Sequence, residues 1–189
     1  MGETAVPQRL TIDEFNELMP DDGIVRELLD GVVYVKGSPT RGHQHVIKRI
    51  ARLWGPYEDA HGGEVFAPGT GTLLSLADGV IPDAAYVRPE RLGIVGEVDV
   101  EGAPDLVVEV LSPGNRGYDL VKKRARYELA GVEELWFVDL EAQRIEVLRL
   151  GADGRYGPPR LFGRGEEITS SVLPGWSAPV DAILGPVAG

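Results

Sequence analysis

The chain has 189 residues, a formal net charge of −11 and no cysteine. This length allows one domain with a full core, and we expect a single domain over residues 1–189. Without cysteine there are no disulfides, thiolate nucleophiles or zinc–thiolate centres, and three histidines are too few for a histidine-rich metal site. Any metal is therefore expected to be bound by oxygen, as Mg²⁺, Mn²⁺ and Ca²⁺ are.

Charge and the lack of targeting segments indicate where the protein acts. No apolar run is long enough to cross a bilayer and the N-terminus lacks the order of a signal peptide, so we expect a cytoplasmic protein without membrane contact. An acidic protein repels a polyanion. Two windows are nevertheless basic, each with a charge of +4: Arg41 to Arg52, which has no acid, and Ser112 to Tyr127, which has one. Such windows fit contacts with phosphates and equally fit solvated helix faces.

The N-terminal segment predicts a short helix followed by a β-hairpin. Thr11 to Met19 (TIDEFNELM) is typical of a short helix that begins with a capping box between Thr11 and Glu14. In Arg26 to Val35 (RELLDGVVYV), Asp-Gly stands between two apolar runs, which is a strong signal for a tight hairpin.

The next segment predicts an amphipathic helix and two strands. His43 to Trp54 has apolar residues at helical spacing and a basic outer face, and the Gly-Pro that follows is expected to end this helix. Two strands, Thr72 to Leu76 and Val80 to Val87, are joined near an Asp-Gly turn. Pro82 inside the second strand indicates an edge position or a strand end. Residues 88–103 are acidic and are expected to form a loop.

The central segment predicts a β-α-β unit. Leu106 to Leu111 (LVVEVL) is nearly continuously apolar, as expected of a central strand covered on both faces. After a break at residues 112–115, a helix from Tyr118 to Ala130 and a buried strand from Leu135 to Asp139 follow. This order implies a parallel pair of strands with the helix over one face. The remaining segments are expected as an alternating strand from Arg144 to Leu150 and irregular short strands over residues 151–189.

Three charged residues lie inside these otherwise apolar elements: Asp83, Glu109 and Lys123. Ionised side chains are costly to bury unless they are paired or hold a metal. Glu109 could instead lie at a frayed strand end or pair with an arginine. If the two carboxylates and the lysine converge, they form a Mg²⁺ site able to hydrolyse phosphodiesters.

Strand geometry selects the carboxylates that can share one ion. Asp105 and Glu109 lie on one strand face but roughly 13 Å apart, at about 3.3 Å per residue. That separation is too large for one ion to contact both directly. Asp83 lies on another strand and can stand beside Glu109 if the strands are neighbours, so this pair is the predicted metal site. Asp105 is expected to cap the start of its strand or to bond to a nearby loop.

Helix periodicity selects the lysine. Leu120, Lys123 and Tyr127 are spaced i, i+3, i+7, so Lys123 is predicted to face the sheet, whereas Lys122 is rotated by about 100° toward solvent. A lysine above a strand that bears a glutamate can hold the attacking water or the scissile phosphate. The alternative is that Lys123 snorkels past the core or pairs with Asp119.

Two further residues are weaker candidates. Glu27 interrupts an apolar strand much as Glu109 does, so it is either another metal ligand or part of a salt bridge at the hairpin edge. His43 begins a helix, where it either helps to cap that helix or takes part in catalysis. The chain has neither a phosphate-binding loop pattern nor a GxSxG motif.

Six segments, in this order along the chain, resemble the Uma-type family of proteins related to restriction endonucleases, within the PD-(D/E)xK nuclease superfamily. The segments are TIDEF, RELLDG, GHQHV, APDLVVEVLSP, YDLVKKRARYELAGVEELWFVD and LPGW. The resemblance implies an α/β fold with a mixed central β-sheet flanked by helices, together with extra hairpins. In the superfamily, a Pro-Asp and an acid on the next strand bind Mg²⁺, and a lysine two residues after the acid aids catalysis.

These elements fall on particular residues of this chain. Pro82-Asp83 and Glu109 match the Pro-Asp and the acid. The position two residues after Glu109 is Leu111, which departs from the superfamily pattern. Uma-type sequences share this departure and supply the lysine from the following helix, where it corresponds to Lys123. Glu27 and His43 also match family positions.

The sequence therefore predicts a Mg²⁺- or Mn²⁺-dependent endonuclease that acts on DNA. Asp83 and Glu109 are the expected metal ligands with Glu27 as an auxiliary ligand, and Lys123 and His43 are expected to assist catalysis.

Cleavage of both strands of a duplex usually calls for two active sites, so we expect a homodimer held partly by apolar residues such as Trp176. The alternative function is a catalytically silent nuclease-like fold that serves as a regulatory or protein-interaction module.

Overall fold

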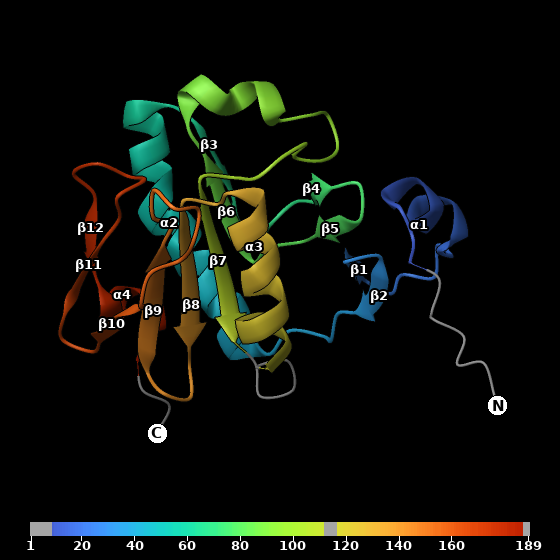
Figure 1. The fold of residues 1–189 in the computed structure, drawn as a ribbon. Coiled ribbons are helices and arrows are strands. Elements are labelled where there is room, and N and C mark those ends of the chain that lie inside the picture. The colour runs from blue at the N-terminus through green and yellow to red at the C-terminus, as the bar shows by residue number, and fades with distance from the viewer. Residues whose placement is uncertain (1–8, 112–116, 187–189) are drawn as a thin grey trace.

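The computed structural model describes residues 9–111 and 117–186, which form three β-sheets and the helices between them (Figure 1). The six strands of the largest sheet lie in the order β10 (Arg160–Gly163), β9 (Arg144–Arg149), β8 (Glu134–Asp139), β7 (Leu106–Leu111), β6 (Ala84–Val87) and β3 (Glu64–Phe66). Strands β7 and β8 run parallel, and the other neighbouring pairs run antiparallel. The central sheet is therefore mixed, as predicted.

Two smaller sheets and the helices complete the structure. The four-stranded antiparallel sheet has the order β2 (Val32–Val35), β1 (Arg26–Leu29), β5 (Asp78–Val80) and β4 (Thr72–Ser75). The third sheet pairs β11 (Glu167–Thr169) with β12 (Ser177–Pro179). The helices are α1 (Ile12–Leu18), α2 (Arg41–His61), the 3₁₀-helix η1 (Pro89–Ile94), the π-helix η2 (Tyr118–Lys123), α3 (Arg124–Ala130) and α4 (Val180–Leu184).

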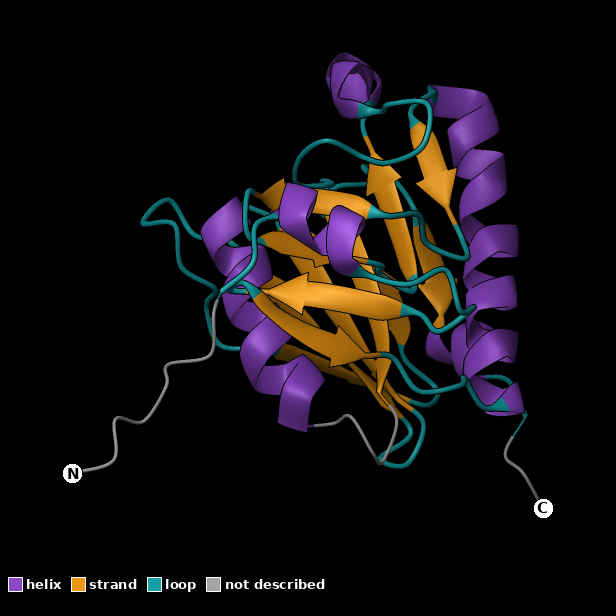
Figure 2. Ribbon diagram, turned by 90° about the vertical axis from the view of Figure 1, so that its right-hand side faces the viewer, coloured by secondary structure: helices purple, strands orange, loops and turns teal. Residues whose placement is uncertain are grey.

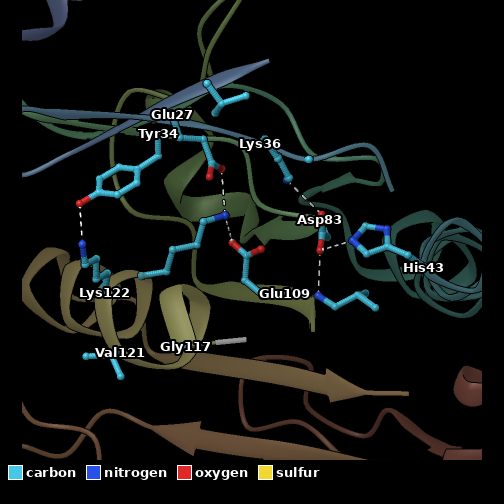
Figure 3. Close-up of a pocket in the computed structure, with 13 residues that line it drawn as sticks. Glu27, Tyr34, Lys36, His43, Asp83, Glu109, Gly117, Val121 and Lys122 are labelled. Carbon is cyan, nitrogen blue, oxygen red and sulfur yellow. Dashed lines mark hydrogen bonds and ion pairs between the residues drawn. The ribbon is translucent and has the colours of Figure 1, made fainter. Parts of the chain in front are cut away.

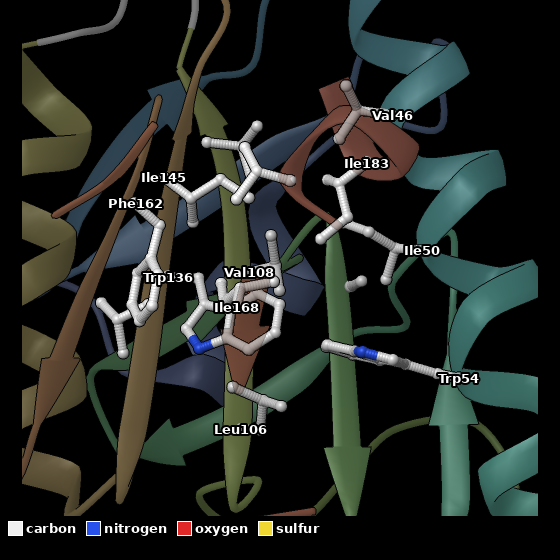
Figure 4. Close-up of a cluster of buried hydrophobic side chains, with 14 of the residues drawn as sticks. Val46, Ile50, Trp54, Leu106, Val108, Trp136, Ile145, Phe162, Ile168 and Ile183 are labelled. Carbon is white, nitrogen blue, oxygen red and sulfur yellow. The ribbon is translucent and has the colours of Figure 1, made fainter. Parts of the chain in front are cut away.

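Helices and the four-stranded sheet cover the two faces of the central sheet. In Figure 1, α2 lies behind the sheet, α3 lies in front of it, and the four-stranded sheet lies to the right. Behind the sheet, α2 packs its buried stripe against the strands, and Trp54 meets Trp136 edge to face with ring centroids 5.6 Å apart (Figure 4). Among the described residues, no helix is both long and apolar enough to cross a bilayer.

The buried strand β7 distributes its side chains between these two layers. Leu106, Val108 and Val110 join the core beneath α2, whereas Val107 and Leu111 join the core beneath α3. Side chains alternate along a strand, so the carboxylate of Glu109 projects from the α3 face. This alternation decides which elements can reach the glutamate.

Helix α2 continues beyond the point where the sequence analysis expected it to end. It runs through Pro56 and ends at Gly62, which has a φ of 77° and donates its N–H to the carbonyl of Glu58 at 2.7 Å. An internal proline costs about 3 kcal/mol. Trp54 is fully buried and Tyr57 packs against the same core, and this burial offsets the cost.

The strand predicted from Val80 to Val87 is divided between two sheets. Strand β5 ends at Val80 in the four-stranded sheet, and β6 begins at Ala84 in the six-stranded sheet. The buried Pro82 lies between them, where a residue without an N–H interrupts neither ladder. The chain therefore crosses between sheets immediately before Asp83.

Several other local predictions agree with the structure. Helix α1 has the predicted capping box, and the Asp30–Gly31 turn has positive φ values of 52° and 71°, as a tight hairpin requires. The break predicted at residues 112–115 lies outside the described residues. Helix α4 falls in a segment expected to be irregular, because five residues are too few to show a helical period.

Trp176 packs within its own chain. Its ring centroid lies 5.8 Å from that of Trp136, and its indole Nε1 donates to the carbonyl oxygen of Leu53 at 3.0 Å. Trp176 therefore stabilises the core of its own chain, and this packing lends no support to the expectation that it holds a dimer.

Asp105 is fully buried at the start of β7 and is bound by a neighbouring loop, as predicted. Its carboxylate accepts the backbone N–H of Arg88 at 2.9 Å, the guanidinium of Arg88 at 3.2 Å and the guanidinium of Arg91 at 2.9 Å. These bonds fix the beginning of the strand that carries Glu109.

Asp105→Ala should therefore destabilise the protein. Loss of an acceptor for buried donors should lower the free energy of unfolding by about 2 kcal/mol in urea titrations. The exposed Asp59→Ala on α2 should stay within about 0.5 kcal/mol of wild type. Equal stability of the two variants would contradict a structural role for Asp105.

Candidate active site

The residues predicted for the site lie together in one pocket of about 540 Å³ (Figure 3). The wall is formed by the β1–β2 hairpin, the first turn of α2, the facing ends of β6 and β7, and helix η2. The predicted residues that line it are Glu27, His43, Asp83, Glu109 and Lys123.

Sheet register brings Asp83 beside Glu109. In the antiparallel pair, Ala84 is opposite Val108, and the N–H of Asp83 donates to the carbonyl of Val108 at 3.1 Å. Extending that register by one residue places Asp83 opposite Glu109. Both carboxylates are buried, with 5% and 2% of their residue surfaces exposed. Two carboxylates thus meet at neighbouring strand positions, as the metal-site prediction requires.

Three donors hold the carboxylate of Asp83. Oδ2 lies 2.8 Å from Nε2 of His43 and accepts the N–H of Val110 at 2.8 Å, while Oδ1 accepts Nζ of Lys36 at 3.1 Å. Burial opposes ionisation of Asp83, but the hydrogen bond with His43 and the charge of Lys36 outweigh it and lower the pKa to about 2. Asp83 is therefore an ionised carboxylate throughout the neutral range.

Lys123 is buried between two other carboxylates, with 1% of its surface exposed. Its Nζ donates to Oε1 of Glu27 at 2.8 Å and to Oε1 of Glu109 at 2.9 Å. The hydroxyl of Tyr127, four residues further along the helix, donates to the same Glu109 oxygen at 2.6 Å. The inward stripe predicted for this helix is thus present. The side chain of Asp119, the alternative partner, is outside the described part of the chain.

Glu109 differs from Asp83 in acidity. Burial is the largest influence on it and, together with the charge of Asp83, outweighs the attraction of Lys123, so the pKa of Glu109 rises to about 8. Its Oε1 already accepts two donors, whereas Oε2 accepts no hydrogen bond from the described residues and points toward Asp83 (Figure 3). Two neighbouring carboxylates with widely separated pKa values are a common arrangement in acid–base sites.

Glu27 binds the segment that crosses between the two sheets as well as Lys123. Its Oε1 accepts both Nζ of Lys123 and the backbone N–H of Ile81 at 2.9 Å, which is in the segment that crosses between the sheets. With 2% of its surface exposed, it lies in the interior and not at the hairpin edge. Its role as a metal ligand stays a prediction.

His43 orients Asp83 and does not cap its helix. The cap is Thr40, whose hydroxyl accepts the N–H of His43 at 3.2 Å, because the helix begins two residues earlier than predicted, at Arg41. The ring of His43 points toward Asp83, and its buried Nδ1 has no hydrogen-bond partner among the described residues.

Sequence reasoning missed Lys36 and the contact made by Lys122. Lys36 follows β2 and reaches Asp83 and the carbonyl of Ile81, the latter at 2.7 Å, but a lysine after a strand carries no periodicity that predicts its direction. Lys122 is exposed, as predicted, yet its Nζ bonds the hydroxyl of Tyr34 at 2.6 Å and lines the pocket. Both contacts depend on where the hairpin packs.

Two carboxylates of the pocket have the chemistry of ligands for one divalent ion. Asp83 is ionised, and Oε2 of Glu109 is an oxygen that the described residues leave without a donor. The described residues contain no group of three or more acidic or histidine side chains arranged for a metal. A metal would thus need water or substrate oxygens for its remaining ligands, as Mg²⁺ commonly does.

Comparison with known proteins shows the family of this chain. Residues 12–181 match the family model Uma2, described as "Putative restriction endonuclease". The chain belongs to the Uma2 family. No curated protein matches the sequence.

A solved structure has the same fold as this Uma2 protein. It is the crystal structure of "a putative nuclease belonging to DUF820" from Anabaena variabilis, with a TM-score of 0.77, 16% sequence identity, and coverage of 93% of this chain and 97% of that chain. The predicted family and the predicted architecture are therefore both confirmed, and at this identity the likeness concerns the fold alone.

The raised pKa of Glu109 predicts a pH dependence of stability. The pKa lies above the ordinary value of 4.5, so the stability contributed by the protonated form is complete below that value and is lost as the pH rises through about 8. Glu109→Gln removes this equilibrium. Between about pH 4.5 and about pH 8, wild type should lose stability relative to Glu109→Gln by up to about 1.4 kcal/mol per pH unit, and the difference should level off at higher pH.

Urea unfolding in EDTA at a series of pH values measures this difference. Glu90→Gln, at an exposed position on η1, should follow wild type over the whole range. If the gap between wild type and Glu109→Gln is constant with pH, the pKa of Glu109 is not raised.

Proposed function

We propose that this Uma2-family protein is a divalent-metal-dependent endonuclease that hydrolyses phosphodiester bonds in DNA. One observation carries the proposal: Asp83 and Glu109, carboxylates of different acidity, stand side by side in a pocket that two lysines enter from other elements. The family description and the nuclease with the same fold support a nuclease-like function.

In this proposal, Asp83 and Glu109 hold Mg²⁺ or Mn²⁺. A bound ion would supply Lewis acidity, which would polarise a phosphate oxygen and lower the pKa of a water molecule. Glu109 must lose its proton to become a ligand, so metal affinity should rise with pH toward about 8. His43 and the N–H of Val110 keep Asp83 in position for this role.

The two lysines take different parts. Lys123 is almost fully buried and fixes Glu109, and Glu27 in turn fixes Lys123. The side chain of Lys36 is 22% exposed, so its ammonium is the more accessible of the two to a phosphate in the pocket. We assign Lys36 to stabilising the charge that develops on the phosphate, and Lys123 to holding Glu109 and the attacking water.

One observation favours the alternative of a silent fold used for regulation or protein interaction. Ammonium groups already contact Asp83 and Glu109, so both carboxylates of the described pocket have cationic protein partners without a metal. A site that needs no metal for its stability is compatible with a pocket that has lost catalysis.

Mn²⁺-dependent nicking of supercoiled plasmid tests the proposal. Asp83→Asn and Glu109→Gln keep the side-chain shapes but remove proposed metal ligands, and Lys36→Gln removes the more accessible of the two ammonium groups. Each should reduce the nicking rate on the order of 10²-fold or more, since each deletes a preorganised electrostatic contact. The exposed Asp153→Asn serves as the control for Asp83→Asn and should nick at the wild-type rate.

Thermal unfolding in the same buffers separates the two functions. Millimolar Mn²⁺ should raise the melting temperature of wild type and of Asp153→Asn, and should raise that of Asp83→Asn much less. Metal stabilisation without nicking would favour the silent fold, whereas equal shifts in wild type and Asp83→Asn would remove the metal site. Lys123→Ala is unsuitable here, because it leaves Glu27 and Glu109 buried without their cation.

We also propose that the protein acts as a homodimer, because cutting a duplex on both strands needs two pockets. Leu129 on α3 is 70% exposed and is a better candidate for the interface than Trp176. Light scattering should give about twice the monomer mass of 20.4 kDa. Leu129→Glu should shift the mass toward the monomer, whereas Leu76→Glu, at an even more exposed leucine, should not. A wild-type mass of one chain would refute the dimer.

A further inference from the structure

The outer face of α2 carries a row of basic residues, four cations and one histidine, that the pocket does not use. Its residues are spaced i, i+4, i+7, i+8 and i+11, which places them on one stripe of the helix: Arg41, His45, Lys48, Arg49 and Arg52. The stripe lies opposite the buried residues Val46, Ile50 and Trp54, and α2 runs along one side of the molecule (Figure 2). We call these five residues the α2 cation row.

The α2 cation row lines a surface depression. Four of its members surround a depression of about 200 Å³: His45, Lys48, Arg49 and Arg52. Within the described residues no acidic side chain lines this depression, and α2 has no acid before Glu58. A ligand placed there would meet positive charge from several side chains at once.

Within the described residues the row also lacks ion pairs, unlike most arginines elsewhere. Among the described residues, no salt bridge involves Arg41, Lys48 or Arg52, and Arg49 donates only to the carbonyl of Leu184, at 3.2 Å. Most other arginines among the described residues do have carboxylate partners, and Arg124 and Arg160 are the exceptions. The paired arginines are Arg9, Arg26, Arg88, Arg91, Arg126, Arg144, Arg149, Arg155 and Arg164.

This arrangement costs stability in the free protein. Like charges at i, i+4 destabilise a helix by about 0.2–0.5 kcal/mol per pair, and Lys48 and Arg52 form such a pair. The chain has 30 acidic residues that could pair with this row, yet none of those in the described part of the chain lines the depression. An external anion would offset the repulsion.

We propose that the α2 cation row is a second nucleic-acid contact, which binds backbone phosphates of DNA outside the pocket. This inference rests on the proposed nuclease function and assigns part of its substrate surface. The row from Arg41 to Arg52 extends over about 16 Å at 1.5 Å per residue. A DNA duplex carries about one negative charge per 1.7 Å of its axis, so several phosphates face a row of this length.

The position of the row predicts which properties it affects. His43 faces the pocket, whereas the row faces away from it on the other side of α2. Loss of the row should therefore weaken binding to long DNA while leaving the chemistry of the pocket unchanged. A small phosphodiester that only fills the pocket should be hydrolysed normally.

Fluorescence anisotropy with a labelled DNA duplex in EDTA tests the proposal at a series of NaCl concentrations. The test protein is the double variant Lys48→Gln/Arg52→Gln. Each phosphate contact contributes about 0.9 to the slope of log affinity against log salt, so the slope should decrease by about 2 and the affinity should fall on the order of tenfold or more at low salt. Arg155→Gln/Arg160→Gln, which removes the same charge at two exposed positions outside α2, is the matched control.

The outcomes separate this inference from the proposed function. If the salt slope is reduced in Lys48→Gln/Arg52→Gln and not in the control variant, the contact is supported, whether or not plasmid is nicked. Unchanged hydrolysis of bis-p-nitrophenyl phosphate by the test variant shows that the pocket is intact. Equal slopes in the test and control variants overturn the inference even if the protein is a nuclease. Failure of wild type to bind duplex, with row-dependent binding to poly-L-glutamate instead, assigns the row to an acidic protein partner and also overturns it.

Discussion

The ammonium of Lys123 joins three parts of the fold at the pocket. It binds Glu27 from the four-stranded sheet and Glu109 from the central sheet, and its own helix packs over the central sheet. Burying three ionisable groups is costly, and removing one partner from such a set leaves an uncompensated charge. The packing of the hairpin against the central sheet, the acidity of Glu109 and the shape of the pocket all depend on this arrangement.

The pocket is balanced so that protein groups satisfy its carboxylates only in part. Lys36 and Lys123 supply positive charge, but the pKa of Glu109 is still raised, because burial and the neighbouring Asp83 dominate. A proton thus occupies the position where a stronger cation could bind. On the proposed function, a divalent ion would displace this proton when it binds Glu109.

Much of this site could be predicted from local sequence patterns, and the rest could not. The charges of Asp83, Glu109 and Lys123 interrupt apolar elements, and strand and helix periods fix the directions of their side chains. Lys36 was missed because its direction is set by the packing of one sheet on another, which leaves no periodic trace in the sequence. The strand from Val80 onward was predicted as continuous, because β-propensity does not reveal a change of sheet.

The crossing between the two sheets takes only residues 81–83 and is held at both ends. The N–H of Ile81 is bound by Glu27, and the N–H of Asp83 is bound by the carbonyl of Val108. A strand that shifts by one residue turns each side chain to the opposite face. Inserting or deleting one residue here would point the carboxylate of Asp83 into the core beneath α2, whereas exposed residues 151–155 between β9 and β10 have no such restriction. In this protein, chain length at the crossing is as strict a requirement as the identity of the acid that follows it.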